Sequence, residues 1–220
     1  MFESPFEESI IKRAIKKGLV EIKPRNLRDW AIDDYGSVDD KPFGGDVGML
    51  IRADVVWKAL DKILNKSPFE KRDKSKTRVV MMSARGKRFD QAKAEELSKL
   101  DHLVLLAGHY EGFDQRISDF MVDEEISIGD YVLTGGELPA MVVIDSVARL
   151  LPGVLGKDES SQTESWSEVE IDGQKMRTIE YPQYTRPREF MDKSVPEVLL
   201  SGDPKKIKQW QMEQIKKTIK

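Results

Sequence analysis

The chain of 220 residues contains no cysteine and only two histidines, His102 and His109. Without cysteine there are no disulfides, no thiolate nucleophiles and no cysteine-ligated metal sites. Two histidines are too few for most multi-histidine metal centres and make a histidine-centred catalytic network an unfavoured interpretation. Carboxylates, arginines, tyrosines and the backbone are therefore the groups left to carry any chemistry.

Long hydrophobic runs and a strong net charge are also missing. No apolar segment approaches the roughly 18–20 residues that a membrane-spanning helix needs, and residues 1–5 do not have the pattern of a signal peptide. Lys and Arg number 36 against 39 Asp and Glu, a net charge of −3, so no global positive field indicates a nucleic-acid partner. We expect a cytoplasmic, folded protein with no membrane partner.

The hydrophobic pattern predicts alternating strands and helices. A strand is expected over 78–82, a helix over 90–100, and a continuous apolar strand over 102–107, as in parallel sheets covered on both faces. This order predicts an α/β fold with flanking helices. Further elements are expected as a helix over 4–18, a strand over 19–22, a helix over 53–64, extended pieces over 125–128 and 131–133, and a helix over 136–151.

The last third of the chain changes character. Residues 157–177 are rich in acidic side chains and predict a flexible linker, with a small hairpin over 169–176. Asp203 and Pro204 have the pattern of a helix start, and a lysine-rich helix follows. The sequence thus predicts three parts: a main domain over 1–156, the linker over 157–177, and a small helical C-terminal domain over 178–220.

Three glycine-containing loops follow apolar segments, over 83–86, 108–112 and 127–136. Neither the dinucleotide-binding glycine fingerprint nor the P-loop is present. Ligands of α/β sheets bind at strand ends, where exposed main-chain groups are able to read a purine edge. Each glycine taken alone also fits a simple turn.

Basic residues are concentrated in two stretches. Residues 66–88 contain nine Lys or Arg against two acidic residues, a net charge of +7, and residues 201–220 contain six lysines against two acidic residues, a net charge of +4. Such patches attract RNA phosphates, although they are equally typical of a solvated surface.

Four motifs together resemble one enzyme family: residues 39–49 (DDKPFGGDVGM), 108–112 (GHYEG), 127–140 continued through Asp145 and 149–156, and 182–187 (PQYTRP). On these motifs the chain resembles the bacterial tRNA (guanine-N1)-methyltransferases of the SPOUT superfamily. The resemblance implies a trefoil-knotted α/β fold, a homodimer, and methyl transfer from S-adenosylmethionine to N1 of the guanosine at position 37 of tRNA, just 3′ of the anticodon. It also implies a dependence on Mg²⁺ without indicating a magnesium site here.

The same resemblance implies which residues bind the methyl donor. They are Met81, Met82, Gly108, Glu111, Ser127, Ile128, Gly129, Tyr131, Leu133, Gly135, Gly136 and Pro139. The segment 39–49 is then expected to line the guanosine site.

The reaction needs a base and a cation, because guanine N1 holds a proton at neutral pH and charge grows on O6 as that proton leaves. The resemblance implies Glu164 as the base and Arg149 as the cation. The family usually has Asp at the position of Glu164, so the carboxylate here is one methylene longer. His109 is expected to have no catalytic role.

Other departures from the family are Ala84-Arg85 in place of Pro-Gln and the lack of a β-strand before Phe2. Two alternatives therefore remain open. One is a knotted RNA ribose 2′-O-methyltransferase, which shares the donor loops but needs no base for a guanine proton. The other is a non-catalytic RNA-binding relative.

Overall fold

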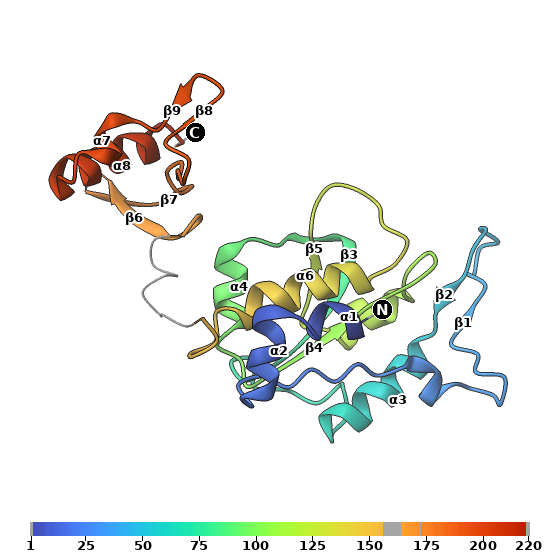
Figure 1. Ribbon diagram of the computed structural model, residues 1–220. Helices are drawn as coiled ribbons and strands as arrows, with labels where there is room; N and C mark the ends of the chain where they lie inside the picture. Colours follow the sequence, from blue (N-terminus) through green and yellow to red (C-terminus); the bar gives the residue numbers. More distant parts are fainter. Residues whose placement is uncertain (1, 156–163, 172, 219–220) are drawn as a thin grey trace. The chain divides into compact units, whose positions relative to one another are not determined.

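The computed structural model describes residues 2–155, 164–171 and 173–218. The chain divides into two compact units, Met1–Leu155 and Gly156–Lys220, drawn in Figure 1. Residues 157–163 of the predicted linker, and Asp172 in its predicted hairpin, lie outside the described residues.

The first unit contains a parallel three-stranded sheet, which confirms the expected α/β class. Its strands are β3 (Thr77–Arg88), β4 (His102–Leu106) and β5 (Glu124–Ser127), in the order β4-β3-β5. Both neighbours pair with β3 in parallel, with Val79 opposite Val104 and Met81 opposite Glu125. The chain therefore crosses from one edge of the sheet to the other between β4 and β5.

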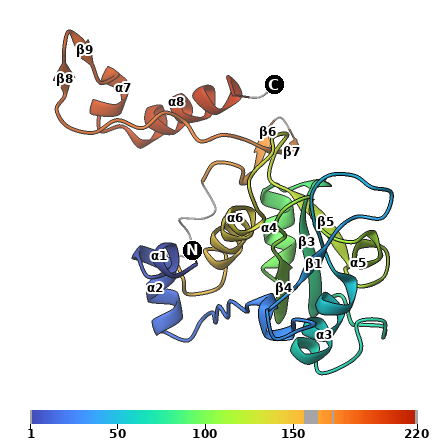
Figure 2. The ribbon, with the colours of Figure 1, turned by 90° about the vertical axis from the view of Figure 1, so that its right-hand side faces the viewer.

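Helices cover both faces of this sheet, as Figures 1 and 2 show. On one face, α3 (Ala53–Leu64) and α5 (Gln115–Phe120) pack with Val79, Met81 and Val104. On the other face, α4 (Gln91–Leu97) and α6 (Glu137–Ala148) pack with Val80, Met82 and Ile126. Alternate residues of β3 thus enter two separate cores, which explains the unbroken apolar run in the sequence.

The loop expected over 83–86 is an excursion within β3. Ile126 of β5 is the register partner of Met82 before it and of Lys87 after it. A Cβ atom on Gly86 would lie 2.5 Å from the backbone N of Ile126, so only glycine fits this approach. The excursion brings residues 83–85 to the carboxyl end of the sheet.

The N-terminal prediction was wrong in two places. The single helix expected over 4–18 is divided into α1 (Glu3–Phe6) and α2 (Ser9–Lys16), with Ser9 at a φ of 51°. Residues 19–22 form no strand, because Ile22 packs on the cluster that joins α1, α2 and α6 instead of pairing with a strand. The residues between α2 and α3 contain only η1 (Leu27–Trp30), β1 (Asp39–Asp40) and β2 (Leu50–Ile51).

Two boundaries further along the chain also differ. Residues 131–133, expected as an extended piece, lie in a loop without strand pairing. Helix α6 ends at Ala148, three residues before the expected end. Among the described residues, no helix has the length and apolar character needed to cross a bilayer.

The described residues of the second unit form two hairpins and two helices. The expected hairpin is confirmed, and Asp203 caps the last helix as predicted, accepting hydrogen bonds from the N–H groups of Lys205 and Lys206 at 3.0 and 3.3 Å. The rings of Tyr184 and Trp210 lie 6.4 Å apart. The elements are β6 (Glu168–Ile171), β7 (Gln174–Arg177), β8 (Glu189–Phe190), β9 (Lys193–Ser194), α7 (Glu197–Leu200) and α8 (Pro204–Lys216).

Candidate active site

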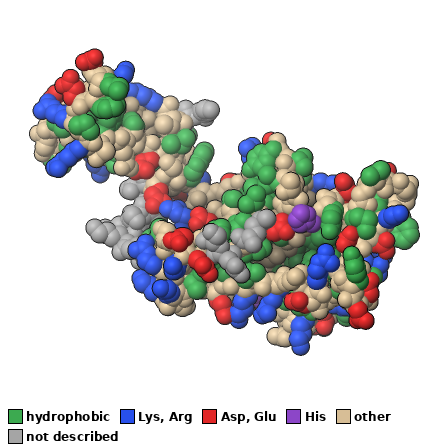
Figure 3. Space-filling view, turned by 45° about the vertical axis from the view of Figure 1, so that its right-hand side comes forward, with side chains coloured by type: hydrophobic (Ala, Val, Ile, Leu, Met, Phe, Trp, Pro, Cys, Tyr) green, Lys and Arg blue, Asp and Glu red, His purple; other side chains and the backbone are tan. Residues whose placement is uncertain are grey.

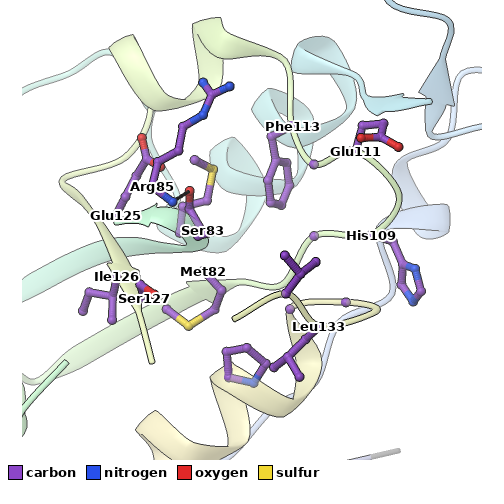
Figure 4. A pocket seen from close by; sticks show the side chains of 18 of the residues that line it. Met82, Ser83, Arg85, His109, Glu111, Phe113, Glu125, Ile126, Ser127 and Leu133 are labelled. Carbon is purple, nitrogen blue, oxygen red and sulfur yellow. Dashed lines mark hydrogen bonds between the residues drawn. The ribbon is translucent and has the colours of Figure 1, made fainter. Parts of the chain in front are cut away.

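A cavity of about 550 Å³ lies at the carboxyl ends of β3, β4 and β5, where the three glycine-containing loops meet (Figure 4). The first loop is residues 83–86, the second 108–112 and the third 127–136. All twelve residues that the resemblance implied for the methyl donor line it, namely Met81, Met82, Gly108, Glu111, Ser127, Ile128, Gly129, Tyr131, Leu133, Gly135, Gly136 and Pro139. Tertiary structure thus brings together residues from three separate segments of the sequence.

The third loop returns to the second loop before α6 begins. The N–H of Gly136 donates to the carbonyl oxygen of Gly108 at 2.7 Å, and Gly135 forms an isolated antiparallel bridge with His109. A Cβ atom on Gly136 would lie 2.6 Å from the backbone N of Gly108 and 2.8 Å from Cα of Ala107. Glycine is therefore required where these two backbones cross.

The wall that the third loop contributes combines apolar side chains with main-chain groups. Ser127 is buried, and its hydroxyl donates to the carbonyl oxygen of Gly129 at 3.0 Å, which shapes the start of the loop. Ile128 and Leu133 add apolar surface to the cavity. This mixture suits a flat heteroaromatic ring that needs both stacking and hydrogen bonds.

The second loop is joined to the segment of residues 39–51. Ile51 N–H donates to Gly112 at 2.8 Å, and Glu111 N–H donates to Met49 at 3.1 Å. This segment extends from the body of the first unit in Figure 1 and carries Phe43 and Val47, which are 100% and 94% exposed. Two backbone hydrogen bonds thus attach this segment, with its exposed apolar side chains, to the second loop.

Opposite charges lie together at one end of the cavity, where Figure 4 shows Arg85 and Glu125. Arg85 Nη1 donates to Gln115 Oε1 at 3.4 Å, and the hydroxyl of Ser118 donates to Glu125. None of these four residues was among the predicted site residues. The only sequence signal was the Ala84-Arg85 departure, because the other three residues join the site through contacts between side chains on different elements, Arg85 with Gln115 and Ser118 with Glu125.

The two predicted catalytic residues do not line the cavity. Arg149 is the residue that caps the C-terminal end of α6, where its N–H donates to Asp145 at 3.2 Å. Glu164 belongs to the second unit, where its carbonyl oxygen accepts from the N–H of Ser167 at 3.0 Å. The structure therefore assembles the predicted donor site within one unit and divides the predicted catalytic pair between the two units.

The basic stretch over 66–88 is less available to phosphate than its charge suggests. Arg72 is buried and forms an ion pair with buried Asp123 at 3.0 Å, and Lys74 contacts the same carboxylate at 3.2 Å. Arg78 pairs with Glu96 of α4 and with Glu124 of β5. Arg88 Nη1 lies 3.9 Å from Asp130 Oδ2. Four of the nine cations are thus paired with acidic residues outside the stretch, which the local charge count could not reveal.

Asp123 is held in its ionised form by these contacts. Burial alone would raise the pKa of its carboxyl, but the N–H of Val79, together with Arg72 and Lys74, lowers that pKa below its usual range. The N–H of Val79 donates to Asp123 Oδ2 at 2.8 Å. This carboxylate therefore connects the start of β3 to the chain just before β5.

No group of three or more histidine, aspartate or glutamate side chains within the described ranges has the arrangement of a metal site. Asp40, one of two adjacent carboxylates considered in the sequence, accepts from Arg52 Nη1 at 3.2 Å. An arginine beside this carboxylate favours a structural ion pair over a cation site.

The fold and the site together define the class of protein. A parallel α/β unit carries a main-chain-rich cavity at its strand ends, as expected for an enzyme that binds a nucleoside-containing cofactor. Comparison with protein-family models identifies the family, described as tRNA (Guanine-1)-methyltransferase TrmD, over residues 1–220. The chain belongs to this family.

Individual relatives agree with the family match. The chain is 46% identical over 220 residues to a tRNA (guanine-N(1)-)-methyltransferase of Geobacter sp. (strain M21), covering 100% of this chain and 82% of the relative. It is 46% identical to the corresponding enzyme of Carboxydothermus hydrogenoformans, covering 97% and 78% of the two chains, and 48% identical to that of Staphylococcus epidermidis (strain RP62A), covering 97% and 81%.

Proposed function

We propose that the protein transfers a methyl group from S-adenosylmethionine to N1 of the guanosine at position 37 of tRNA. The observation that carries this proposal is the single cavity lined by all twelve residues implied for the donor. Family membership identifies the reaction class, and the cavity gives that reaction a place in this chain.

The cavity suits the chemical parts of the donor. The third loop offers Ile128 and Leu133 to an adenine ring and main-chain groups to its edge. At the other end, Arg85 and Glu125 match the carboxylate and ammonium groups of a methionyl tail. Bound in this way, S-adenosylmethionine would supply a methyl group on a sulfonium sulfur, which leaves with the electron pair of the broken carbon–sulfur bond as a neutral thioether.

Proton removal from N1 is assigned to Glu164, and stabilisation of the charge on O6 to Arg149. The carboxylate takes the N1 proton as the nitrogen lone pair attacks the methyl carbon, and the guanidinium offsets charge that develops on O6. Positioning of N1 in line with the methyl group supplies much of the remaining acceleration. Glu164 differs from the usual aspartate only by the length of its side chain.

Two surfaces suit the tRNA. The segment 39–51 presents Phe43 and Val47 for contact with an unpaired base, because an exposed aromatic ring stacks on any nucleobase. Helix α8 of the second unit is rich in lysine, and its Trp210 ring lies against Tyr184. Residues 178–220 therefore form the proposed tRNA-binding domain, joined by the linker of residues 157–177 to the catalytic domain of residues 1–156.

The trefoil knot and the homodimer are part of the same proposal. The crossing between β4 and β5, and the return of the third loop to Gly108, support a knotted path through the donor site. On α6, Leu138 and Val142 are 49% and 44% exposed and lie one turn apart, and Figure 3 shows hydrophobic side chains gathered on the surface of this unit. A second copy of the chain is the proposed cover for this apolar surface.

The deciding experiment follows labelled methyl groups from S-adenosylmethionine into two transcripts of one tRNA, with guanosine or adenosine at position 37. We expect label only in the guanosine transcript, at N1 after digestion to nucleosides. Label on a ribose 2′-oxygen would establish the alternative methyltransferase. Donor binding without any transfer, to either transcript or to native tRNA, would establish a non-catalytic relative.

A further inference from the structure

Helix α2 carries apolar and basic side chains on opposite faces. Ile11 and Ala14 are only 4% and 1% exposed, and Ile11 packs with Met141 and Ala148 of α6. The opposite face carries four exposed cations, Lys12, Arg13, Lys16 and Lys17. Because residues four apart on a helix are neighbours, these four side chains form one continuous surface, the basic face of α2.

The basic face of α2 is not neutralised within the chain. None of its four side chains forms an ion pair or a hydrogen bond with a residue that the structure describes. The acidic residue that follows the helix, Glu21, pairs with Lys23 at 2.8 Å instead. In the stretch over 66–88, by contrast, four of nine cations are paired with acidic residues outside it. The basic face of α2 is therefore available to an external anion.

The same helix borders the segment that carries the proposed catalytic arginine. Ile11 shares a buried cluster with Ala148, which directly precedes Arg149. Just beyond α2, Leu19 lies against the chain that follows Arg149, because a Cβ atom on Gly153 would be 3.7 Å from Leu19 Cδ1. Figures 1 and 2 show α2 alongside α6. Phosphates next to a guanosine that reaches Arg149 would therefore lie near this helix.

We propose that the basic face of α2 binds the phosphate backbone of the tRNA, an inference that rests on the proposed function. Cations gathered on one exposed surface attract RNA phosphates and displace the counterions condensed on them. An anionic membrane, another partner of basic amphipathic helices, requires the apolar face of the helix as well. In α2 that face is buried through Ile11 and Ala14, so its cations favour RNA.

Stabilisation of the helix itself does not account for the whole face. Cations in the last turn of a helix interact favourably with its dipole, and this effect falls off within that turn. It applies to Lys16 and Lys17 but not to Lys12, which lies in the first half of α2. Lys12 and Lys16 are therefore the pair to replace in a test of phosphate binding.

The test measures the affinity of the full chain for tRNA at several salt concentrations from about 0.05 to about 0.3 M, where phosphate contacts give a linear dependence of log affinity on log salt. For Lys12→Gln/Lys16→Gln we expect this slope to become shallower by about 1.4–1.8, the value for two phosphate contacts. Near 0.1 M salt this change corresponds to an affinity roughly 25- to 60-fold weaker. Affinity for S-adenosylhomocysteine should remain that of the wild type.

The matched control is Lys58→Gln/Lys62→Gln. These lysines are also exposed and four residues apart, but they lie on α3, which covers the other face of the sheet. The control removes the same net charge and should keep the wild-type slope, and Lys12→Arg/Lys16→Arg, which retains both charges, should keep it as well.

A wild-type slope in Lys12→Gln/Lys16→Gln, or an equal change in the control, would overturn the inference. A loss of S-adenosylhomocysteine binding in the same variant would assign its defect to folding and would also contradict the inference. If the wild-type protein neither binds nor methylates tRNA, the proposed function itself fails.

Discussion

At the scale of single residues, the chemistry depends on whether a carboxylate is exposed to substrate or buried with a partner. Glu164 is the proposed base, and Asp123 is a buried carboxylate held by Arg72, Lys74 and the N–H of Val79. The amino-acid composition does not distinguish these two acidic residues. Their surroundings do: removing the charge of Glu164 is expected to lower activity, and removing the charge of Asp123 is expected to lower stability.

Replacing Glu164 with glutamine retains its shape and its hydrogen-bonding capacity but removes the acceptor for the N1 proton. We expect single-turnover methyl transfer to slow by about 10²- to 10⁴-fold, the usual range for loss of a general base. Affinity for S-adenosylhomocysteine should change little. Glu164→Asp is the matched control and should retain appreciable activity, since aspartate is the usual family residue. A Glu164→Gln enzyme as fast as the wild type would place the base elsewhere.

Replacing Asp123 with asparagine leaves the buried Arg72 without its charge partner. We expect the free energy of unfolding in urea to fall by about 3–5 kcal/mol, the cost of breaking a buried pair. Asp34→Asn, at an exposed position, serves as the control and should be close to neutral. Equal stability of the two variants would show that the buried pair contributes little.

The same carboxylate predicts a dependence of stability on pH. Because the pKa of Asp123 is lowered in the folded protein, its contribution is complete above the pKa of the unfolded chain and is lost as the pH falls through the folded value. Urea unfolding at decreasing acidic pH should therefore cost the wild-type protein more stability than Asp123→Asn. Parallel losses in both proteins would assign acid sensitivity to other carboxylates.

At the scale of elements, the donor site depends on one loop lying against another. The third loop crosses the second at Gly136, where the backbones approach too closely for any side chain. A single β-carbon there would meet the backbone of Ala107 and Gly108 directly after β4, and it must separate the two walls of the cavity. We expect the main effect of such a change to be on binding.

We expect Gly136→Ala to abolish measurable binding of S-adenosylhomocysteine in calorimetry while circular dichroism and the oligomeric state remain those of the wild type. Gly173→Ala is the control, because Gly173 has open space around it, and its φ of 80° imposes only the ordinary strain of replacing a turn glycine. Undiminished affinity in Gly136→Ala would contradict the assignment of this loop.

At the scale of the whole molecule, the two proposed catalytic residues belong to different compact units of one chain. Arg149 follows α6 of the first unit and Glu164 lies near the start of the second. In the proposed homodimer, the donor site of one subunit receives the linker of its partner. Activity then depends on assembly as well as on the residues.

Mixing two inactive variants tests this arrangement. Arg149→Ala and Glu164→Gln should each be inactive as homodimers, and an equal mixture that exchanges subunits should recover about a quarter of wild-type activity. Half of the dimers are then mixed, and each mixed dimer has one intact site of two. Verified heterodimers without activity would show that both residues serve a site within one chain.

Local patterns in the sequence were sufficient for much of the fold. The apolar runs predicted β3 and β4, the spacing of apolar residues predicted α3, and the Asp203 cap was found where expected. These features depend on neighbours within a few residues, and periodicity and capping report such neighbours directly. The break at Ser9 was missed because packing of α1 and α2 against α6 overrides a locally favourable helix.

By itself the sequence determined the α/β alternation, the three loops that form the cavity and the motifs of the family. Only the tertiary structure decided the partners of the charges: Arg72 pairs with Asp123, and Arg85 lies with Glu125 at one end of the cavity. These residues are distant in sequence or lie on different elements, and no local pattern records which of them meet. The physical reason is that an ion pair forms only when two charged side chains lie within a few ångströms of each other. The path of the chain through the fold, such as its crossing from β4 to β5, determines which side chains become neighbours.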